Sequence, residues 1–249
     1  MPCGLHWAMR PEALPLFERP HHRRVAQVLQ ALDGDLLRER HCLFGGGTAM
    51  ALRYGEYRES VDIDFLVSDL AAYRQLRHAL TGADGMAAVT RAGAPALVQA
   101  GELRADQYGI RTRIVADDQP IKFEIVFEAR IVLDAPGRND AQCGVPTLTP
   151  LDMATGKLLA NSDRWPDDGV FSRDLIDLAM MKPTLPLLRQ AIAKAEGAYG
   201  ETIRRDLQRA IDRMQARTGW LERCMRMMGV AGTPAQVWQR IRALRRVLV

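Results

Sequence analysis

Paired cysteines are the first feature that the chain lacks. Its four cysteines, Cys3, Cys42, Cys143 and Cys224, are scattered through 249 residues, and no two form a Cys-x-x-Cys pair. Structural zinc sites need closely spaced cysteines, and small disulfide frameworks need many of them. The pattern therefore argues against both classes of protein and is typical of the reducing cytoplasm.

Long hydrophobic runs are also absent. No stretch of about 18 apolar residues occurs, which is the length that a membrane-spanning helix needs. The first twenty residues are interrupted by prolines and have no long apolar core, so we expect no signal peptide there. These absences predict a cytoplasmic protein without a membrane partner.

The composition is otherwise ordinary, but the charge is unevenly distributed. The chain is 47% hydrophobic and 26% charged, as in many soluble globular proteins, and it contains no internal repeat. Residues 1–150 carry 17 Lys+Arg against 19 Asp+Glu, whereas residues 151–249 carry 17 against 11. The excess of positive charge in the second half indicates an anionic partner there.

The hydrophobic period changes near residues 146–150. Before this point the pattern predicts helices at 21–40, 48–55 and 70–82, a strand at 61–68 and several strands between 102 and 131. After it the pattern predicts helices at 151–164, 172–181, 184–197, 201–217 and 234–247. We therefore predict an α+β chain, with a mixed sheet and helices over residues 1–148, including an extended lead-in over 1–20, and a helical domain over 149–249.

Two aspartates interrupt an otherwise apolar strand in the segment "VDIDFLV". Asp62 and Asp64 alternate with Ile63 and Phe65, so both carboxylates point to the same face of the strand. Burying two ionised carboxylates is costly unless they are paired or bind a metal. Aspartate is also depleted from strands, so a solvated sheet face explains the pair poorly.

A second strand, "IKFEIVFE", repeats this alternation. Ile121, Phe123 and Ile125 form its apolar face, and Glu124 lies on the other face. Glu124 supplies a third carboxylate if this strand pairs beside the first, although a solvated acid on a half-exposed face would also explain it. Three carboxylates suit Mg²⁺, which binds carboxylates, water and substrate phosphates.

A glycine-rich turn precedes the aspartates. Gly45, Gly46 and Gly47 allow backbone N–H groups to approach a ligand closely. We expect Thr48 to be the N-cap of the following helix, whose N-terminus attracts anions. A tight turn alone would need such glycines too, but the order of turn, helix and aspartates favours a phosphate site.

These motifs together resemble the nucleotidyltransferase superfamily related to polymerase beta. The segments "FGGGTAMALRYGEYRESVDIDFLV", "LDMATGKLLANSDR" and "RDLIDLAMM" narrow the resemblance to the AbiEii/AbiGii nucleotidyltransferase toxins of abortive-infection and type IV toxin–antitoxin systems. The resemblance covers roughly residues 25 to 182; beyond it the chain is similar only in being helical. It implies transfer of a nucleotide, in this family to the ends of transfer RNA.

The resemblance also implies roles for individual residues. Gly47 and Thr48, after Gly46, match the phosphate-binding Gly-Ser pair, with threonine in place of serine. Asp62 and Asp64 match the metal-binding aspartates, and Glu124 stands where the family has an aspartate, which leaves its role as third metal ligand open. Lys157 and Asp174 match the catalytic lysine and aspartate of the helical motifs, with Lys157 also contacting the nucleotide.

Other polar residues near these motifs allow two interpretations. Lys157, Asn161 and Arg164 share one helix face, where a lysine could stabilise charge on the leaving pyrophosphate. Alternatively, salt bridges between helices explain Arg164 and Asp177, and also Lys157 and Asp174. Arg58, which we predict to bind nucleotide, could instead hold its loop in place, as could Ser60.

A stripe of arginines marks the helix predicted at 201–217. Arg205, Arg209, Arg213 and Arg217 recur at four-residue spacing, and like charges at this spacing cost a few tenths of a kcal/mol per pair. Arginine matches the geometry of phosphate well. We predict that the stripe binds RNA, the alternative being a solvated helix face.

The sequence thus predicts a two-domain enzyme that uses two Mg²⁺ ions to move a nucleoside monophosphate from a nucleoside triphosphate to an acceptor hydroxyl. The expected acceptor is the 3′ end of transfer RNA, and the expected setting is a toxin with a cognate antitoxin. Two alternatives stay open: nucleotidylation of a protein side chain or small molecule, and a catalytically idle module that binds nucleotide or RNA.

Overall fold

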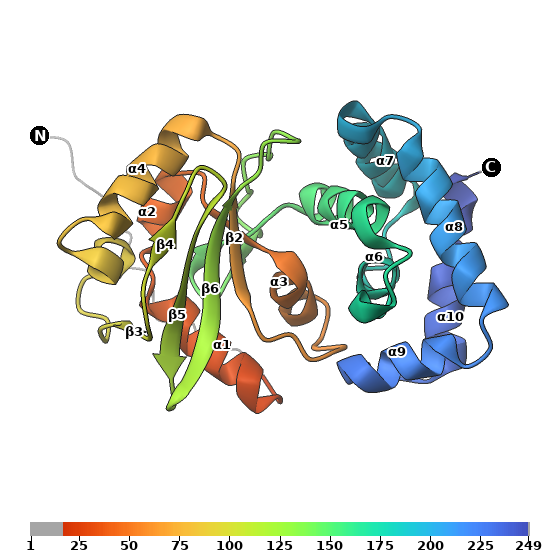
Figure 1. Cartoon of the computed structure of the whole chain (residues 1–249), viewed down its shortest axis with the longest axis horizontal. Helices are drawn as coiled ribbons and strands as arrows, with labels where there is room; N and C mark the ends of the chain where they lie inside the picture. Colours follow the sequence, from red (N-terminus) through yellow and green to blue (C-terminus); the bar gives the residue numbers. More distant parts are fainter. Residues whose placement is uncertain (1–16, 249) are drawn as a thin grey trace, which may run out of the picture.

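A computed structural model describes residues 17–248 of the chain. A mixed sheet with its helices lies on one side of the molecule, and a group of helices lies on the other (Figure 1). The architecture is therefore α+β, as predicted. The lead-in expected over residues 1–20 falls mostly outside the described residues.

The main sheet has the order β1-β2-β6-β5-β3, with β4 paired to β5. Its strands are β1 (Leu43–Gly45), β2 (Ile63–Val67), β3 (Val98–Gln99), β4 (Arg104–Ala105), β5 (Gly109–Ala116) and β6 (Gln119–Phe127). Strands β2 and β6 run parallel at the centre, whereas β1 and β5 flank them in antiparallel orientation. A small separate ribbon joins β7 (Ala141–Gln142) to β8 (Val145–Pro146).

Four α-helices belong to the sheet side of the molecule: α1 (Pro20–Ala31), α2 (Gly34–Glu39), α3 (Gly46–Arg53) and α4 (Leu70–Thr81), with a 3₁₀ turn at Gly85–Val89. The single helix predicted over 21–40 is wrong. Asp33 ends it because its carboxylate accepts the backbone N–H groups of Asp35 and Leu36, which starts a second helix.

The predicted N-cap of α3 is also wrong. The helix begins at Gly46 with Gly45 in the N-cap position, so Thr48 lies inside the first turn. Its side chain is 1% exposed. The hydroxyl is therefore directed into the protein and does not cap the helix.

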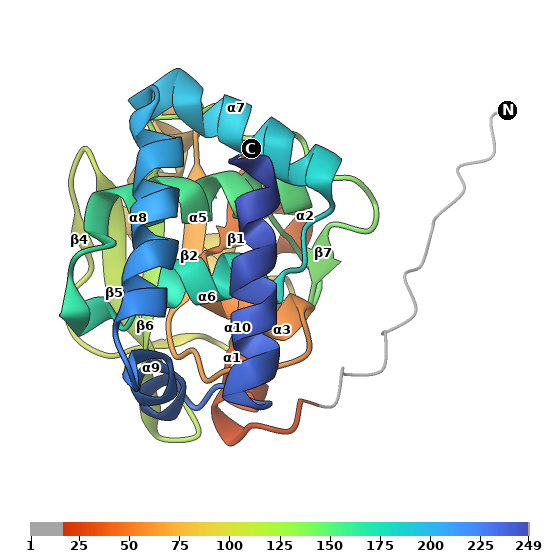
Figure 2. The same cartoon turned by 90° about the vertical axis from the view of Figure 1, so that its right-hand side faces the viewer.

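The second group holds α5 (Pro150–Arg164), α6 (Arg173–Met180), α7 (Leu185–Tyr199), α8 (Thr202–Ala216), α9 (Trp220–Met228) and α10 (Pro234–Ala243), with 3₁₀ turns at Asp168–Val170 and Leu244–Val247. Helix α5 packs against α6, α7 and α8. Helices α8 and α10 run over the outer side of α5 and α6, and α9 crosses below them (Figure 2). Helix α9 was missing from the sequence prediction.

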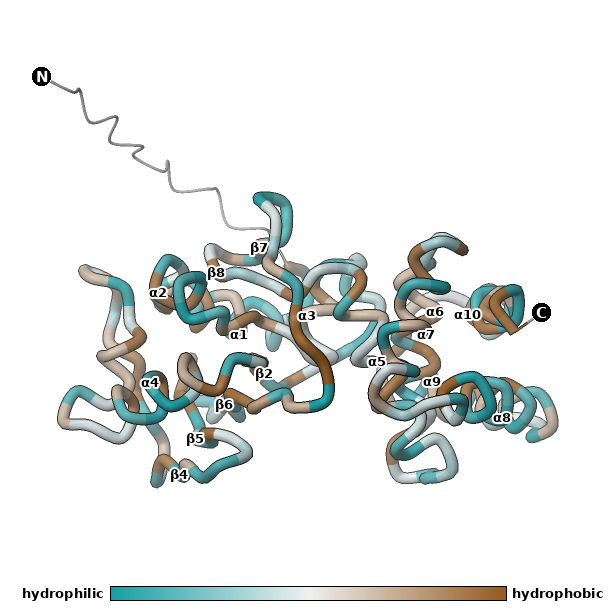
Figure 3. Tube along the Cα trace, turned by 90° about the horizontal axis from the view of Figure 1, so that it is seen from above, coloured by the Kyte–Doolittle hydropathy of each residue, from teal (hydrophilic) through white to brown (hydrophobic). Residues whose placement is uncertain are grey.

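One hydrophobic core continues through both groups. The tilted rings of Phe44, Phe65 and Phe123 form a row across strands β1, β2 and β6, with neighbouring ring centroids 5.6 and 5.7 Å apart. The apolar helix α3 lies between the sheet and α5 and α6, where its brown stretch marks the junction (Figure 3). The core extends from there to Leu158 and Leu207. The division into domains at residue 148 stays a prediction. No helix within residues 17–248 is long and apolar enough to cross a membrane.

Candidate active site

Three carboxylates gather on one face of the central strands. Asp62 directly precedes β2, and Asp64 lies within it between the buried side chains of Ile63 and Phe65. Because β2 and β6 are parallel in this register, Asp64 lies opposite Glu124. The pairing that the sequence left conditional is thus present.

The surroundings of Asp64 disfavour its negative charge. Burial raises the pKa of Asp64 to about 6, and the neighbouring Asp62 and Glu124 add to this, while Lys122 and Lys157 oppose it. A bound cation would stabilise the ionised form. The site therefore fits a cation with oxygen ligands.

Glu124 is engaged by two cationic side chains. Lys122 Nζ lies 2.7 Å from one carboxylate oxygen, and Arg111 Nε lies 3.1 Å from the other. Within residues 17–248, no three His, Cys, Asp or Glu side chains lie close enough to hold a metal ion by themselves. The aspartate pair fits Mg²⁺, which commonly completes its shell with water and substrate phosphate, whereas Glu124 would first have to leave its partners.

The glycine turn has no room for side chains. Gly46 has a φ of +69°, and a Cβ there would overlap the carboxylate of Asp64. A Cβ on Gly47 would overlap Nη2 of Arg58 and lie 3.2 Å from Oγ of Ser60. The turn is thus in direct contact with the strand that carries the aspartates and with the loop before it.

Thr48 and Arg58, both predicted to bind nucleotide, are engaged within the protein. The Thr48 hydroxyl donates to Ser60 Oγ at 2.9 Å. Arg58 is 5% exposed and donates to Asp177 through Nε at 2.6 Å and Nη2 at 2.9 Å. Its Nη1 donates to the carbonyl of Glu59. Arg58 therefore fixes its loop to α6, as the alternative interpretation held.

Lys157 and Asp174 belong to the same buried ionic network. Lys157 Nζ lies 2.7 Å from Asp177 and 3.1 Å from Asp174, and Arg164 Nε lies 2.7 Å from Asp174. Burial alone would raise the pKa values of both aspartates. Lys157, together with Arg58 at Asp177 and Arg164 at Asp174, nevertheless holds them below their usual range. Arg164 and Asp177 thus both form salt bridges, as the alternative interpretation held. Arg164 pairs with Asp174, whereas Asp177 pairs with Arg58 and Lys157.

Lys157 connects this network to the aspartate pair. It is 8% exposed, and its charge lowers the pKa of Asp64 against the effect of burial. The lysine of α5 therefore contributes positive potential at the face where Asp62 and Asp64 lie. Lys157 thus acts electrostatically on Asp64, and Asp174 helps to hold the lysine.

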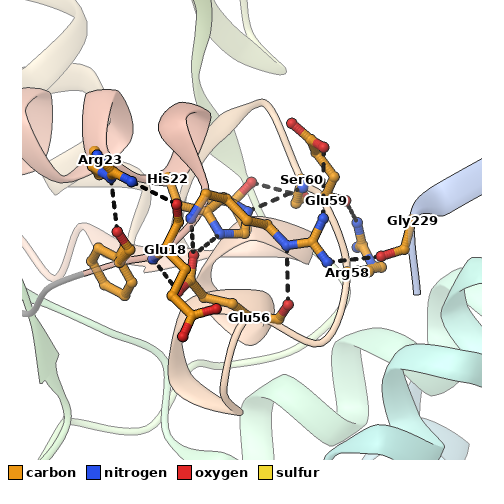
Figure 4. Close-up of polar contacts among 11 residues, drawn as sticks. Glu18, His22, Arg23, Glu56, Arg58, Glu59, Ser60 and Gly229 are labelled. Atoms are coloured by element: carbon orange, nitrogen blue, oxygen red, sulfur yellow. Dashed lines mark hydrogen bonds and ion pairs between the residues drawn. The ribbon is translucent and has the colours of Figure 1, made fainter. Parts of the chain in front are cut away.

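One group has a larger role than the salt bridge predicted from sequence, and a second was missed. Asp177 accepts a hydrogen bond from Tyr57 besides those from Arg58 and Lys157; its spacing from Asp174 gave only a weak signal. His22 of α1 is completely buried and bonds Glu56 at 2.7 Å, beside the loop that leads to the aspartates (Figure 4). A single histidine in an amphipathic helix gave no signal.

The arginine stripe of α8 is partly paired. Arg213 and Arg217 both bind Asp168, at 2.7 and 2.5 Å. Arg205 and Arg209 are more exposed, at 53% and 54%, and lie 3.2 and 3.9 Å from Asp206. The stripe therefore contains two arginines held by an exposed acid and two that face solvent.

The glycine turn, the aspartates at the start of β2 and the lysine of α5 lie in the segments that carry the resemblance to nucleotidyltransferases. Residues 27–244 match the family model described as nucleotidyl transferase AbiEii toxin of type IV toxin–antitoxin systems, so the chain belongs to that family and is a nucleotidyltransferase toxin. The match reaches through α10, beyond residue 182, near which the resemblance expected from sequence ends. Membership implies a cognate antitoxin.

One of the solved structures that match the chain shares this fold. JHP933 from Helicobacter pylori is 15% identical with a TM-score of 0.51, and the alignment covers 92% of this chain and 90% of that one. MenT4, a nucleotidyltransferase toxin from Mycobacterium tuberculosis, is 19% identical with a TM-score of 0.48, covering 91% and 85%. A comparison with curated proteins finds no match.

Proposed function

We propose that the protein transfers a nucleoside monophosphate from a nucleoside triphosphate to an acceptor hydroxyl in a metal-dependent reaction. The observation that carries this proposal is the aspartate pair at the start of β2, where Asp64 lies opposite Glu124 of β6 and in contact with the turn at Gly46. The raised pKa of Asp64 supports it, since a divalent cation would offset the burial and the carboxylate repulsion that raise this pKa.

Asp62 and Asp64 would hold Mg²⁺, two ions in our proposal, with Glu124 as a third ligand after release from Lys122 and Arg111. When bound, Mg²⁺ supplies Lewis-acid stabilisation of the reacting phosphate oxygens. The backbone N–H groups of the glycine turn would bind the phosphate chain.

Lys157 would stabilise the charge that develops on the departing pyrophosphate. It is fixed by two aspartates, so it would not need to reorganise as that charge appears. Asp174 is engaged by both Lys157 and Arg164, so its contribution to catalysis would be to orient Lys157.

For the acceptor we propose the 3′ end of transfer RNA. The support is the family, together with the exposed side chains of Arg205 and Arg209 on α8 and the surplus of positive charge in the second half of the chain. Phosphate contacts of this kind provide affinity without base specificity.

A labelling experiment tests the reaction. The protein is incubated with total RNA, Mg²⁺ and each of the four nucleoside triphosphates, labelled at either the α- or the γ-phosphate. We expect label from the α position only, in RNA of transfer-RNA size, and none after periodate oxidation of the RNA. Label on a protein or small molecule would identify that molecule, rather than RNA, as the acceptor. Label from the γ position would indicate a kinase. No transfer would favour an idle binding module.

Variants test the roles of the site residues. Asp62→Asn combined with Asp64→Asn should abolish transfer, and Lys157→Ala should lower turnover more than it lowers stability. Asp84→Asn, at an acid of the turn after α4, serves as a control and should keep wild-type turnover. Full activity of the double aspartate variant would refute the metal assignment.

A further inference from the structure

Two hydroxyls, those of Thr48 and Ser60, lie at the glycine turn, and the structure distinguishes their surroundings. Thr48 occupies the position that the sequence predicts for this hydroxyl. Its residue is 1% exposed, and its hydrogen is donated to Ser60 Oγ at 2.9 Å. Because Thr48 is buried and paired with Ser60, its hydroxyl has no exposed side from which to reach a phosphate oxygen.

Ser60 has the opposite situation. It is only partly buried, and its Oγ accepts the hydrogen bond from Thr48, which leaves its own hydrogen free. The missing side chain of Gly47 leaves the space in which Ser60 Oγ approaches the turn, 3.2 Å from an ideal Cβ. The neighbouring glycine, Gly46, is in contact with Asp64 in the same way. The Ser60 hydroxyl and the Asp64 carboxylate therefore border the same turn.

The backbone of Ser60 is fixed from the other side. Its N–H donates to Nε2 of His22 at 3.3 Å, and Nδ1 of the same ring bonds Glu56 at 2.7 Å (Figure 4). Burial lowers the pKa of His22, although Glu56 opposes this effect. The lowered pKa favours the neutral ring. A neutral ring with its hydrogen on Nδ1 can donate to Glu56 and accept from Ser60 at once.

We propose that the Ser60 hydroxyl, rather than the Thr48 hydroxyl, donates to the phosphate chain of the bound nucleotide, and that Thr48 and His22 are positioning residues for it. Thr48 fixes the side chain of Ser60 by the hydrogen bond between their hydroxyls, and His22 fixes the backbone of Ser60. This inference rests on the proposed function, because it concerns the nucleotide that the enzyme would bind. His22 lies before residue 27, where the family match begins.

Direct nucleotide binding tests the proposal without turnover. Dissociation constants of the four nucleoside triphosphates are measured by equilibrium dialysis with Mg²⁺ and without RNA, and the tightest ligand is used for the variants. A hydrogen bond to a charged phosphate oxygen predicts that Ser60→Ala weakens binding about tenfold or more. Ser68→Ala, at the other end of β2, is the matched control and should bind as the wild type does, since Ser68 Oγ accepts only from Leu133 N–H.

A double-mutant cycle separates the two hydroxyls. If Thr48 acts through Ser60, then Thr48→Val weakens binding in the wild type but has no further effect in the Ser60→Ala background. If the losses instead multiply, Thr48 contacts the nucleotide itself and the proposal is overturned. Melting temperatures check folding, and Ser60→Cys, which keeps the size of the side chain with a weaker donor, replaces any Ser60→Ala protein that does not fold and should also bind more weakly.

The controls also separate this inference from the proposed function. A wild-type protein that binds none of the four triphosphates would contradict both. Wild-type binding that Ser60→Ala and Ser60→Cys leave unchanged would overturn the role of Ser60 alone.

Discussion

Lys157 Nζ lies 2.7 Å from Oδ2 of Asp177, a carboxylate with no exposure to solvent. The other oxygen of Asp177 receives Arg58 and Tyr57 from the loop before β2. One carboxylate thus joins the loop that leads to the aspartate pair with the helix that carries the lysine. It is therefore one of the contacts that hold the sheet and the helical group together.

Asp177→Ala should therefore destabilise the protein strongly. It leaves two buried cations, Arg58 and Lys157, without their shared partner, and breaking a buried ion pair typically costs about 3–5 kcal/mol. Urea denaturation measures the loss. Asp212→Ala is the control: this carboxylate is 53% exposed in its pair with Arg245, so its removal should cost less than about 1 kcal/mol. Equal losses would show that Asp177 does not hold the two groups together.

Asp64→Asn should stabilise the protein at neutral pH without divalent cations. The pKa of Asp64 is raised to about 6 in the folded protein, above the value of about 3.9 in an unfolded chain. Its ionisation therefore costs stability, fully above pH 6 and progressively less as the pH falls towards 4. A shift of roughly two units predicts a gain of about 2–3 kcal/mol at pH 8 and almost none at pH 4.

Thermal or urea unfolding in EDTA at both pH values measures this difference. Added Mg²⁺ should then stabilise the wild type more than Asp64→Asn, because only the carboxylate gains from a cation. A variant that is less stable than the wild type at pH 8 in EDTA would contradict the prediction.

Two substitutions of His22 distinguish its two hydrogen bonds. His22→Gln keeps an acceptor at the distance of Nε2 and should retain the bond from the Ser60 N–H. His22→Asn keeps a donor near Glu56 but is too short to reach Ser60. We expect weaker nucleotide binding and faster amide exchange over residues 57–63 in His22→Asn than in His22→Gln. The reverse order would mean that His22 acts through Glu56 alone.

Patterns local in sequence predicted much of the site. The alternation around Asp62 and Asp64 identified the strand and the face of the carboxylates, and the same alternation identified Glu124. The register that brings Asp64 opposite Glu124 followed only from the fold, because the two are 60 residues apart in the chain. Strand alternation shows which face a residue lies on but not which strand is its neighbour.

Partners distant in sequence could not be predicted. Arg58 meets Asp177 across 119 residues, and His22 meets Ser60 across 38. A buried acid and an exposed one look alike in a helical pattern, so the sequence left Asp177 as an ordinary salt-bridge residue. Thr48 shows a similar limit: a threonine after glycines is typical of an N-cap, but the glycines themselves begin α3.

The fate of the arginine stripe also depends on a distant partner, Asp168. This acid lies in the 3₁₀ turn between α5 and α6 and binds both Arg213 and Arg217 of α8. The guanidinium groups lower the pKa of Asp168, so it is ionised at neutral pH. If the stripe binds RNA as proposed, Asp168 competes with RNA phosphates for two of the four arginines.

Asp168→Asn should consequently strengthen RNA binding and make it more dependent on salt. Each additional phosphate contact steepens the slope of log affinity against log salt by roughly 0.7–0.9, so releasing two arginines predicts a change of up to about two. Asp167→Asn is the matched control, because it removes the same charge from the neighbouring residue. Within residues 17–248 the carboxylate of Asp167 bonds only the backbone N–H of Gly169. Filter binding of transfer RNA between 50 and 200 mM salt measures both slopes.

If the two variants steepen the slope equally, the effect is one of net charge. If neither changes it while Arg205→Gln with Arg209→Gln flattens it, RNA contacts only the exposed half of the stripe. If none of the variants changes it, the stripe is a solvated face of α8 and the acceptor binds elsewhere.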